Sequence, residues 1–153
     1  MLTQDLTTEG LDSFLQGIAN AVTKPDVPDA MQAALGVTKA DLVAGFQTST
    51  APDGSRWAPL KNPRPPGHNP DTKPLIDTGA LQDSVGYQGS EHIEGVSGEG
   101  FTLGSSVYYA EVHQEGSKKK NIPARPFMGF SEEVLDTTAD LAADSIVNQI
   151  NKL

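Results

Sequence analysis

Apolar residues near the start of the chain recur at helical spacing. Within residues 10–24, four of them are separated by steps of four, three and four: Leu11, Leu15, Ile18 and Val22. This spacing places them on one face of a helix. Pro25 is expected to end the helix, because a proline ring is incompatible with a helix interior.

A second helix is predicted to start near Pro28, since proline fits the first turn of a helix. Its apolar positions also lie on one face: Met31, Leu35, Leu42 and Phe46. Gly36 and Gly45 each weaken a helix by about 1 kcal/mol relative to alanine. We therefore expect this second helix to be bent or broken.

The last predicted helix, residues 131–153, carries two stripes. Ser131 is a favourable N-cap, and the acidic residues after it suit the first turn of a helix. The apolar stripe consists of Leu135, Ala139, Ala142, Ile146, Ile150 and Leu153. The second stripe is entirely acidic: Glu133, Asp136, Asp140 and Asp144. Like charges at this spacing cost about 0.2–0.5 kcal/mol per pair. Two interpretations are open: a solvated face, or a surface that meets a basic partner or repels DNA in a channel.

Residues 49–74 are predicted to be irregular, because the segment is rich in proline. Each proline removes a backbone donor and pushes the preceding residue away from helix. A structureless loop of this length is unusual in a compact domain and is either disordered or functional. Trp57 in its middle indicates that at least one point is held against apolar groups.

Residues 76–130 alternate short elements with glycine-rich turns. We predict a helical turn capped by Asp77 or Thr78, then a strand over residues 84–88. Further strands over 93–97 and 101–105 would complete an antiparallel meander. A short helix is expected over residues 108–114, ended by Gly116.

Length and element order predict one domain over residues 1–153. Its parts are N-terminal helices (10–48), the extended proline-rich loop (49–74), a sheet with short helices (76–130) and the C-terminal helix (131–153). The predicted fold class is α+β, with a small antiparallel sheet packed with the N-terminal helices and the long C-terminal helix. The chain has no cysteine, which excludes disulfides and thiolate metal sites. Its start lacks the pattern of a signal peptide, and no apolar run suits a membrane span.

Charge is unevenly distributed along the chain. The formal net charge of −9 argues against specific binding to DNA, because Lys and Arg supply much of that affinity. Residues 76–117 contain acidic residues but no Lys or Arg. Basic residues outnumber acidic ones in residues 51–75, and residues 118–125 contain basic residues but no acidic ones. These segments are either solvated loops or complementary edges that meet between copies of the chain.

Signals of an enzyme are missing from the sequence. No two histidines have metal-binding spacing, no serine lies in a GxSxG elbow, and no phosphate-binding glycine motif is present. We therefore predict no catalytic residue, no metal and no cofactor. His113 lies four residues after Tyr109 and is expected to share its helical face, with packing as its role. A pH switch or a ligand role is the alternative.

The candidate interface residues are basic and aromatic. Arg125 stands between two prolines, and is either a plain surface residue or an anchor for a carboxylate of a neighbouring copy. Lys118, Lys119 and Lys120 are expected to form a loop tip that is free or touches DNA or an acidic neighbour. The other candidates are Arg56, Trp57, Tyr108, Tyr109 and Phe127.

Five short segments stand in a distinctive order: PDGSRWAPL (52–60), KPLIDTGAL (73–81), LGSSVYYA (103–110), His113-Gln114 and PARPF (123–127). Together they resemble the phage virion morphogenesis family, which includes tail completion proteins of contractile-tailed phages. The resemblance covers roughly residues 50–135. The family pattern has an aromatic residue and Gly after His-Gln, whereas this chain has Glu115-Gly116.

The resemblance implies a structural virion protein at the junction of head and tail, assembled in the host cytoplasm. It implies a homo-oligomeric ring, a hexamer above all, that contacts neck, connector or tail proteins. We expect an acidic inner wall that lets DNA pass without binding it. The alternatives within the virion are a tail terminator, a minor tail protein or a head-side connector component. Outside the virion, a binding or regulatory module is the alternative.

Overall fold

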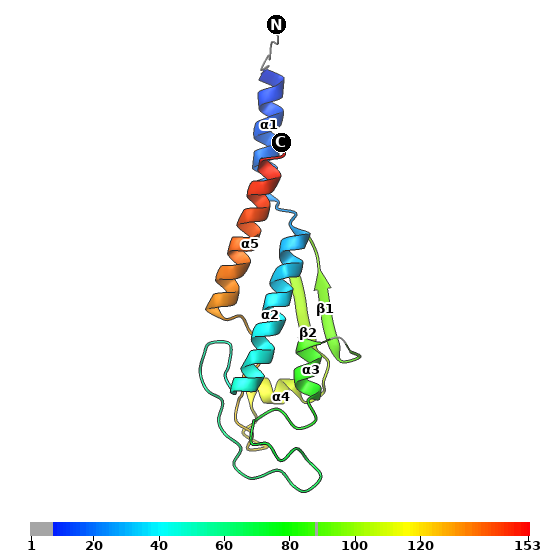
Figure 1. Ribbon diagram of the computed structural model, residues 1–153, viewed down its shortest axis with the longest axis vertical. Coiled ribbons are helices and arrows are strands. Elements are labelled where there is room, and N and C mark those ends of the chain that lie inside the picture. Colours follow the sequence, from blue (N-terminus) through cyan, green and yellow to red (C-terminus); the bar gives the residue numbers. More distant parts are fainter. Residues whose placement is uncertain (1–7, 88) are drawn as a thin grey trace.

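The structure is a computed structural model that describes residues 8–87 and 89–153. Figure 1 shows an elongated molecule in which α2 (Pro28–Thr48) lies between α5 (Glu132–Ile150) and a β-hairpin. The hairpin consists of β1 (His92–Val96) and β2 (Phe101–Ser105). Helices with a small antiparallel sheet and a long C-terminal helix confirm the predicted α+β fold class.

The two ends of the molecule differ in structure. At one end, α3 (Ala80–Gly86) and α4 (Ala110–Glu115) lie beside long irregular segments. We call these segments, residues 49–77 and 117–130, the loop base. At the other end, α1 (Thr8–Thr23) lies against the last turns of α5 and extends beyond them (Figure 1). We call α1 together with residues 146–153 the stalk.

Helix α2 supplies the centre of the core. The predicted apolar face is confirmed, since Met31, Leu35, Leu42 and Phe46 are all buried. The expected break is wrong, because α2 runs unbroken through both glycines. A Cβ at Gly45 would lie 2.8 Å from the carbonyl oxygen of Thr50. The missing side chain therefore lets the chain fold back closely where the loop base begins.

The predicted meander is only a hairpin. In it, β1 pairs with β2 antiparallel, with His92 opposite Ser105. The strand predicted over residues 84–88 is wrong within the described residues, because Ser84 and Val85 belong to α3 (Gln88 lies outside them). Both side chains are buried together with Leu81. A strand would have placed Ser84 and Val85 on opposite faces, whereas a helix places all three on one.

Helix caps follow the prediction at α5 and depart from it at α3. Ser131 caps α5, and its hydroxyl accepts a hydrogen bond of 3.2 Å from the Val134 amide. The N-cap of α3 is Gly79, with φ of 89° and no side-chain cap. The N-cap position predicted for Asp77 or Thr78 is therefore wrong, although the Thr78 hydroxyl accepts a hydrogen bond of 3.3 Å from the Ala80 amide at the start of α3. Gly116, with φ of 78°, ends α4 as predicted.

The apolar stripe predicted for α5 is only partly buried. The buried residue of this helix is Val134, and further along Leu141, Ala142 and Ile146 pack against Val27 and its neighbours. Leu135, the first residue of the predicted stripe, is 54% exposed, and Leu153, its last residue, is 59% exposed. The chain itself therefore does not cover the stripe at these two residues. The helix is rotated about its axis so that it meets α2 with one flank of the stripe.

Candidate assembly surfaces

Trp57 holds the loop base against the core. Its indole N–H donates a hydrogen bond of 2.7 Å to the carbonyl of Pro126, and its ring packs edge-on against Phe46 with 5.5 Å between centroids. The side chain is 6% exposed. The expected apolar contact is confirmed. Trp57 is thus an internal anchor, and burial leaves it no surface for the partner contact that was also considered.

Arg125 is also used inside the chain. Its Nε donates to the carbonyl of Ala58 at 2.7 Å, and Nη2 donates to the carbonyl of Pro59 at 2.9 Å. Burial lowers the pKa of Arg125 from its ordinary value. Neither predicted role fits, because the guanidinium is buried rather than superficial and binds carbonyls rather than a carboxylate. Its planar fork matches two consecutive carbonyl groups of an extended segment.

Gln114 completes this anchor and was missed as a candidate residue. Its side-chain oxygen accepts hydrogen bonds of 3.0 Å from the amides of Phe127 and Met128, and its amide nitrogen donates to the Met128 carbonyl at 3.0 Å. The amides of Phe127 and Met128 have no backbone acceptor among the described residues, and the Gln114 side chain is the acceptor for both. The fixed order of His-Gln and PARPF was the available signal. Phe127 itself is a core residue.

The rest of the proline-rich segment is closed by its own polar side chains. Arg64 donates to the carbonyls of Asp71 and Lys73 at 2.5 and 2.7 Å. Asp77 accepts from the Asn69 amide at 2.9 Å and from His68 Nδ1 at 2.5 Å. These bonds, that of Asn69 first, lower the pKa of Asp77. Asp77 therefore closes a loop and does not cap a helix.

Tyr109 and His113 line a cavity of about 380 Å³ at the edge of the loop base, and the ring of Tyr108 lies next to that of Tyr109. Tyr109 and His113 meet edge to face at 5.8 Å, so the predicted shared face is confirmed. Burial, and then Arg125, lower the pKa of His113, whose Nδ1 is buried without a hydrogen-bond partner in the described part of the chain. Tyr108 packs on Tyr109 yet is 93% exposed. Among the aromatic candidates, Tyr108 offers the most free surface.

The predicted basic tip is an exposed, closed turn. Lys118, Lys119 and Lys120 are exposed, and two backbone hydrogen bonds of 2.8 and 2.9 Å between Ser117 and Ile122 close the turn behind them. We call these three lysines the lysine tip. Arg56 is also exposed. Both candidates therefore keep their charged groups available to a partner.

All four residues of the acidic stripe are exposed on α5: Glu133, Asp136, Asp140 and Asp144. Exposure fits a solvated face as well as a face toward a basic partner or a DNA channel. The choice between these roles therefore stays a prediction.

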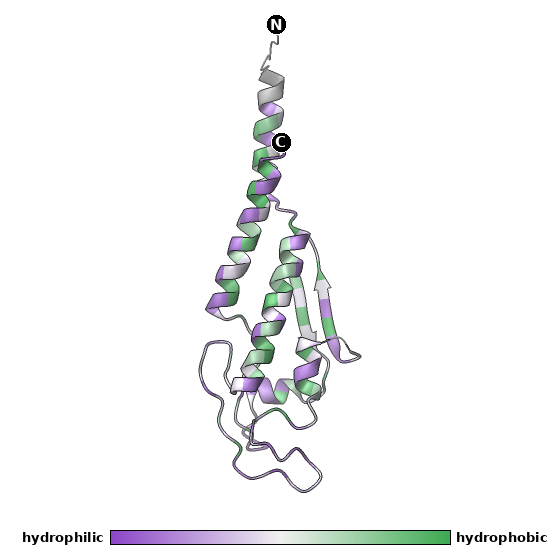
Figure 2. Cartoon of the chain, viewed as in Figure 1, coloured by the Kyte–Doolittle hydropathy of each residue, from purple (hydrophilic) through white to green (hydrophobic). Residues whose placement is uncertain are grey.

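The stalk exposes apolar surface. Figure 2 shows hydrophobic residues along α1 and the end of α5. The large exposed ones are Phe14, Leu15, Val22, Val147 and Leu153. A Cβ at Gly17 would lie 2.9 Å from Leu153, so α1 meets α5 on the side of this glycine. Leu15 and Val22 belong to the apolar stripe and remain 53% and 58% exposed. The contact within one chain thus covers only part of the stripe.

Two kinds of site are absent from the described residues. They contain no group of three or more His, Asp or Glu side chains arranged to hold a metal ion. None of their helices combines the length and the apolar character that a membrane crossing requires.

Comparisons with known proteins give one family and one relative. The sequence pattern of the phage virion morphogenesis family matches residues 6–146. An uncharacterized protein of Methanocaldococcus jannaschii is 40% identical over 78 residues, which cover 48% of this chain and 54% of that protein. The match therefore spans about half the length of the relative. No solved structure matches.

Proposed function

Because this chain belongs to the phage virion morphogenesis family, we propose that it is a neck or tail completion protein. In this proposal, copies of the chain form a ring at the head–tail junction that joins or finishes the tail and lets DNA pass. The family supports the coarser role, a structural or assembly role in the virion. The ring and its place rest on the surfaces described above.

The observation that carries the ring is the apolar stalk. A helix of 16 residues is marginal by itself in water, and the stripe of α1 is only partly covered by α5. Monomeric proteins rarely leave contiguous large apolar patches in water. Neighbouring stalks would bury Leu15 and Val22, and the hexamer is the order we expect.

The acidic stripe fits the passage of DNA. On α5, Asp136, Asp140 and Asp144 lie on a different face from Leu135, so apolar contacts between copies on the Leu135 side would leave the carboxylates solvated. A wall of carboxylates around a channel repels the phosphate backbone. We therefore place this stripe toward the lumen of the ring.

Light scattering on the purified chain tests the ring. The expected result is a discrete species near six copies of the 16.2 kDa chain, which Leu15→Gln with Val22→Gln would shift toward monomer. Gln16→Ala, an exposed polar position on the same helix, is the matched control. Equal masses for the double variant and the wild type would remove the stalk from the ring contact.

Tail preparations that lack this protein test the place in the virion. Adding the purified chain is expected to let these tails join heads, and electron microscopy would count the joined particles. Binding to heads without tails would instead favour a head-side connector component. Tails of altered length would favour a terminator, and binding along the tail would favour a minor tail protein. A chain that neither self-associates nor binds heads or tails would contradict the proposed function.

A further inference from the structure

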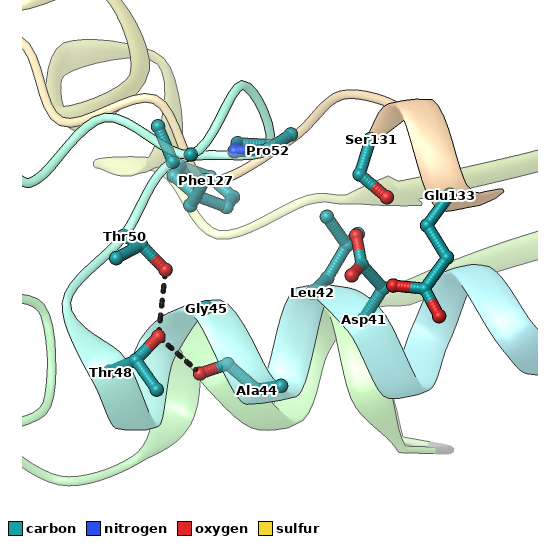
Figure 3. A pocket seen from close by; sticks show the side chains of 12 residues that line it. Asp41, Leu42, Ala44, Gly45, Thr48, Thr50, Pro52, Phe127, Ser131 and Glu133 are labelled. Carbon is teal, nitrogen blue, oxygen red and sulfur yellow. Dashed lines mark hydrogen bonds between the residues drawn. The ribbon is translucent and has the colours of Figure 1, made fainter. Parts of the chain in front are cut away.

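A groove lies between α2, the turn after it and the start of α5. Its volume is about 220 Å³. Leu42 and Phe127 contribute apolar lining, and Asp41 and Glu133 also line it, together with Ser131. Figure 3 shows the carboxylates of Asp41 and Glu133 pointing toward each other. The groove therefore combines an apolar lining with two negative charges that come from different helices.

Both charges lack a partner within the described residues. There, neither Asp41 nor Glu133 takes part in an ion pair, and neither side chain forms a hydrogen bond. Two carboxylates at one groove repel each other, and a cation between them removes that repulsion. An ammonium group on a flexible, apolar stem is suited to such a groove, since the stem can cover apolar atoms while the charge meets the carboxylates.

The lysine tip is the matching group on the same chain. Its three ammonium groups form no ion pair with any described residue. The tip is followed directly by Asn121, whose side-chain oxygen accepts a hydrogen bond of 3.1 Å from Lys61 Nζ of the proline-rich segment. The groove opens beside Pro52 and Gly54. None of the three lysines lines the groove, so the tip and the groove are separate patches of opposite charge.

We propose that the lysine tip of one copy docks in the Asp41–Glu133 groove of the next copy. This inference rests on the proposed ring and names one of its contacts. Because the two patches differ, the contact is head-to-tail, and such contacts generate a ring where the rotation between copies closes and an open filament where it does not. The acidic net charge of the chain favours a protein partner over DNA for the tip, and the charge match favours another copy.

Disulfide trapping tests the contact directly, because the chain has no cysteine of its own. Lys119→Cys with Glu133→Cys places one thiol at the tip and one at the groove. Oxidation is expected to produce a ladder of covalent dimers, trimers and larger species on a denaturing gel. Lys119→Cys with Asp144→Cys is the matched control, since Asp144 is exposed on the same helix outside the groove. Each single variant can give dimers at most.

A ladder that does not exceed the control, both with the concentrated chain and with the chain bound to tails, would overturn the proposed contact. If the wild type still forms rings and completes tails, only the contact fails. If the ladder forms while the chain has no role at the head–tail junction, the contact stands and the proposed function fails.

Charge exchange adds a second readout. One variant carries Lys118→Glu, Lys119→Glu and Lys120→Glu, and the other carries Asp41→Lys and Glu133→Lys. Each alone should self-associate about tenfold more weakly or worse, because like charges then face each other. An equimolar mixture should recover assembly, since each tip then meets an oppositely charged groove. A lack of recovery in the mixture would contradict the head-to-tail contact, as would variants that assemble like the wild type. Loss of DNA binding alone would assign the tip to DNA.

Discussion

The loop base and the stalk contrast in a way that secondary structure does not suggest. The loop base has almost no regular structure, yet buried side chains hold it at several points, with Trp57 and Arg125 as the main anchors. The stalk is helical except for its last three residues, yet it leaves large apolar residues such as Leu15 and Val22 in solvent. Irregular backbone can therefore be firmly fixed, and regular backbone can leave large apolar side chains exposed.

The physical difference lies in where each region finds its interaction partners. Backbone groups in the loop base pair with one another only in local turns, such as the one between Ser117 and Ile122. Side chains such as Arg125 and Gln114 supply partners for other backbone groups there. The stalk satisfies its backbone within each helix, so only its apolar side chains remain without contacts. We expect substitutions in the loop base to lower the stability of the fold, and substitutions in the stalk to change assembly.

The largest effect is expected at Trp57. Trp57→Ala removes a buried ring and the hydrogen bond to Pro126, and should lower the free energy of unfolding by about 3–5 kcal/mol. Urea denaturation measures this value. Trp57→Phe, which keeps most of the packing and loses the hydrogen bond, should cost clearly less. A cost below about 1 kcal/mol for the alanine variant would show that the loop base is not anchored there.

Arg125 should follow. Arg125→Met keeps much of the side-chain volume but leaves the carbonyls of Ala58 and Pro59 without donors, at a cost of about 1–3 kcal/mol. Limited proteolysis should then cut residues 58–64 faster than in the wild type. Arg56→Met, at an exposed position, is the control and should change neither measurement. Equal effects of the two substitutions would contradict the anchoring role.

A smaller effect is expected from pH at His113. Its pKa is lower in the folded chain than the ordinary value of 6.5, chiefly because of burial. Between these two pKa values the unfolded chain binds more protons, so stability is complete above about pH 6.5 and falls as the pH drops toward the folded-state pKa. His113→Gln should flatten this part of the curve of unfolding free energy against pH. An unchanged slope would mean that another group, for example Asp77 at lower pH, causes the acid sensitivity.

The smallest effect on the fold is expected in the stalk. Under dilute conditions in which the chain is monomeric, Leu15→Gln and Val22→Gln should each change the free energy of unfolding by less than about 0.5 kcal/mol. Leu35→Ala, at a fully buried position of α2, should cost about 2–5 kcal/mol. Large destabilisation of the monomer by the stalk variants would erase the contrast between the two regions.

Sequence reasoning identified the helices and their caps where local chemistry decides them. The periodicity of α1, α2 and α5, the Ser131 cap and the Gly116 stop all depend on residues a few positions apart. The family resemblance was likewise carried by short segments in order, and it is confirmed. Errors arose where local signals conflict, as at Ser84 and Val85, whose short run suited a strand or a helix equally.

The sequence by itself thus determined the fold class, the family and the expectation that Trp57 holds at least one point of the proline-rich segment against apolar groups. Only the tertiary structure decided which other side chains hold it. The partners of Gln114 and Arg125 are carbonyls and amides that every residue carries, so no residue type marks them in advance. Only the structure, likewise, showed that α5 meets α2 with one flank of its stripe, because helix rotation depends on how whole surfaces fit together.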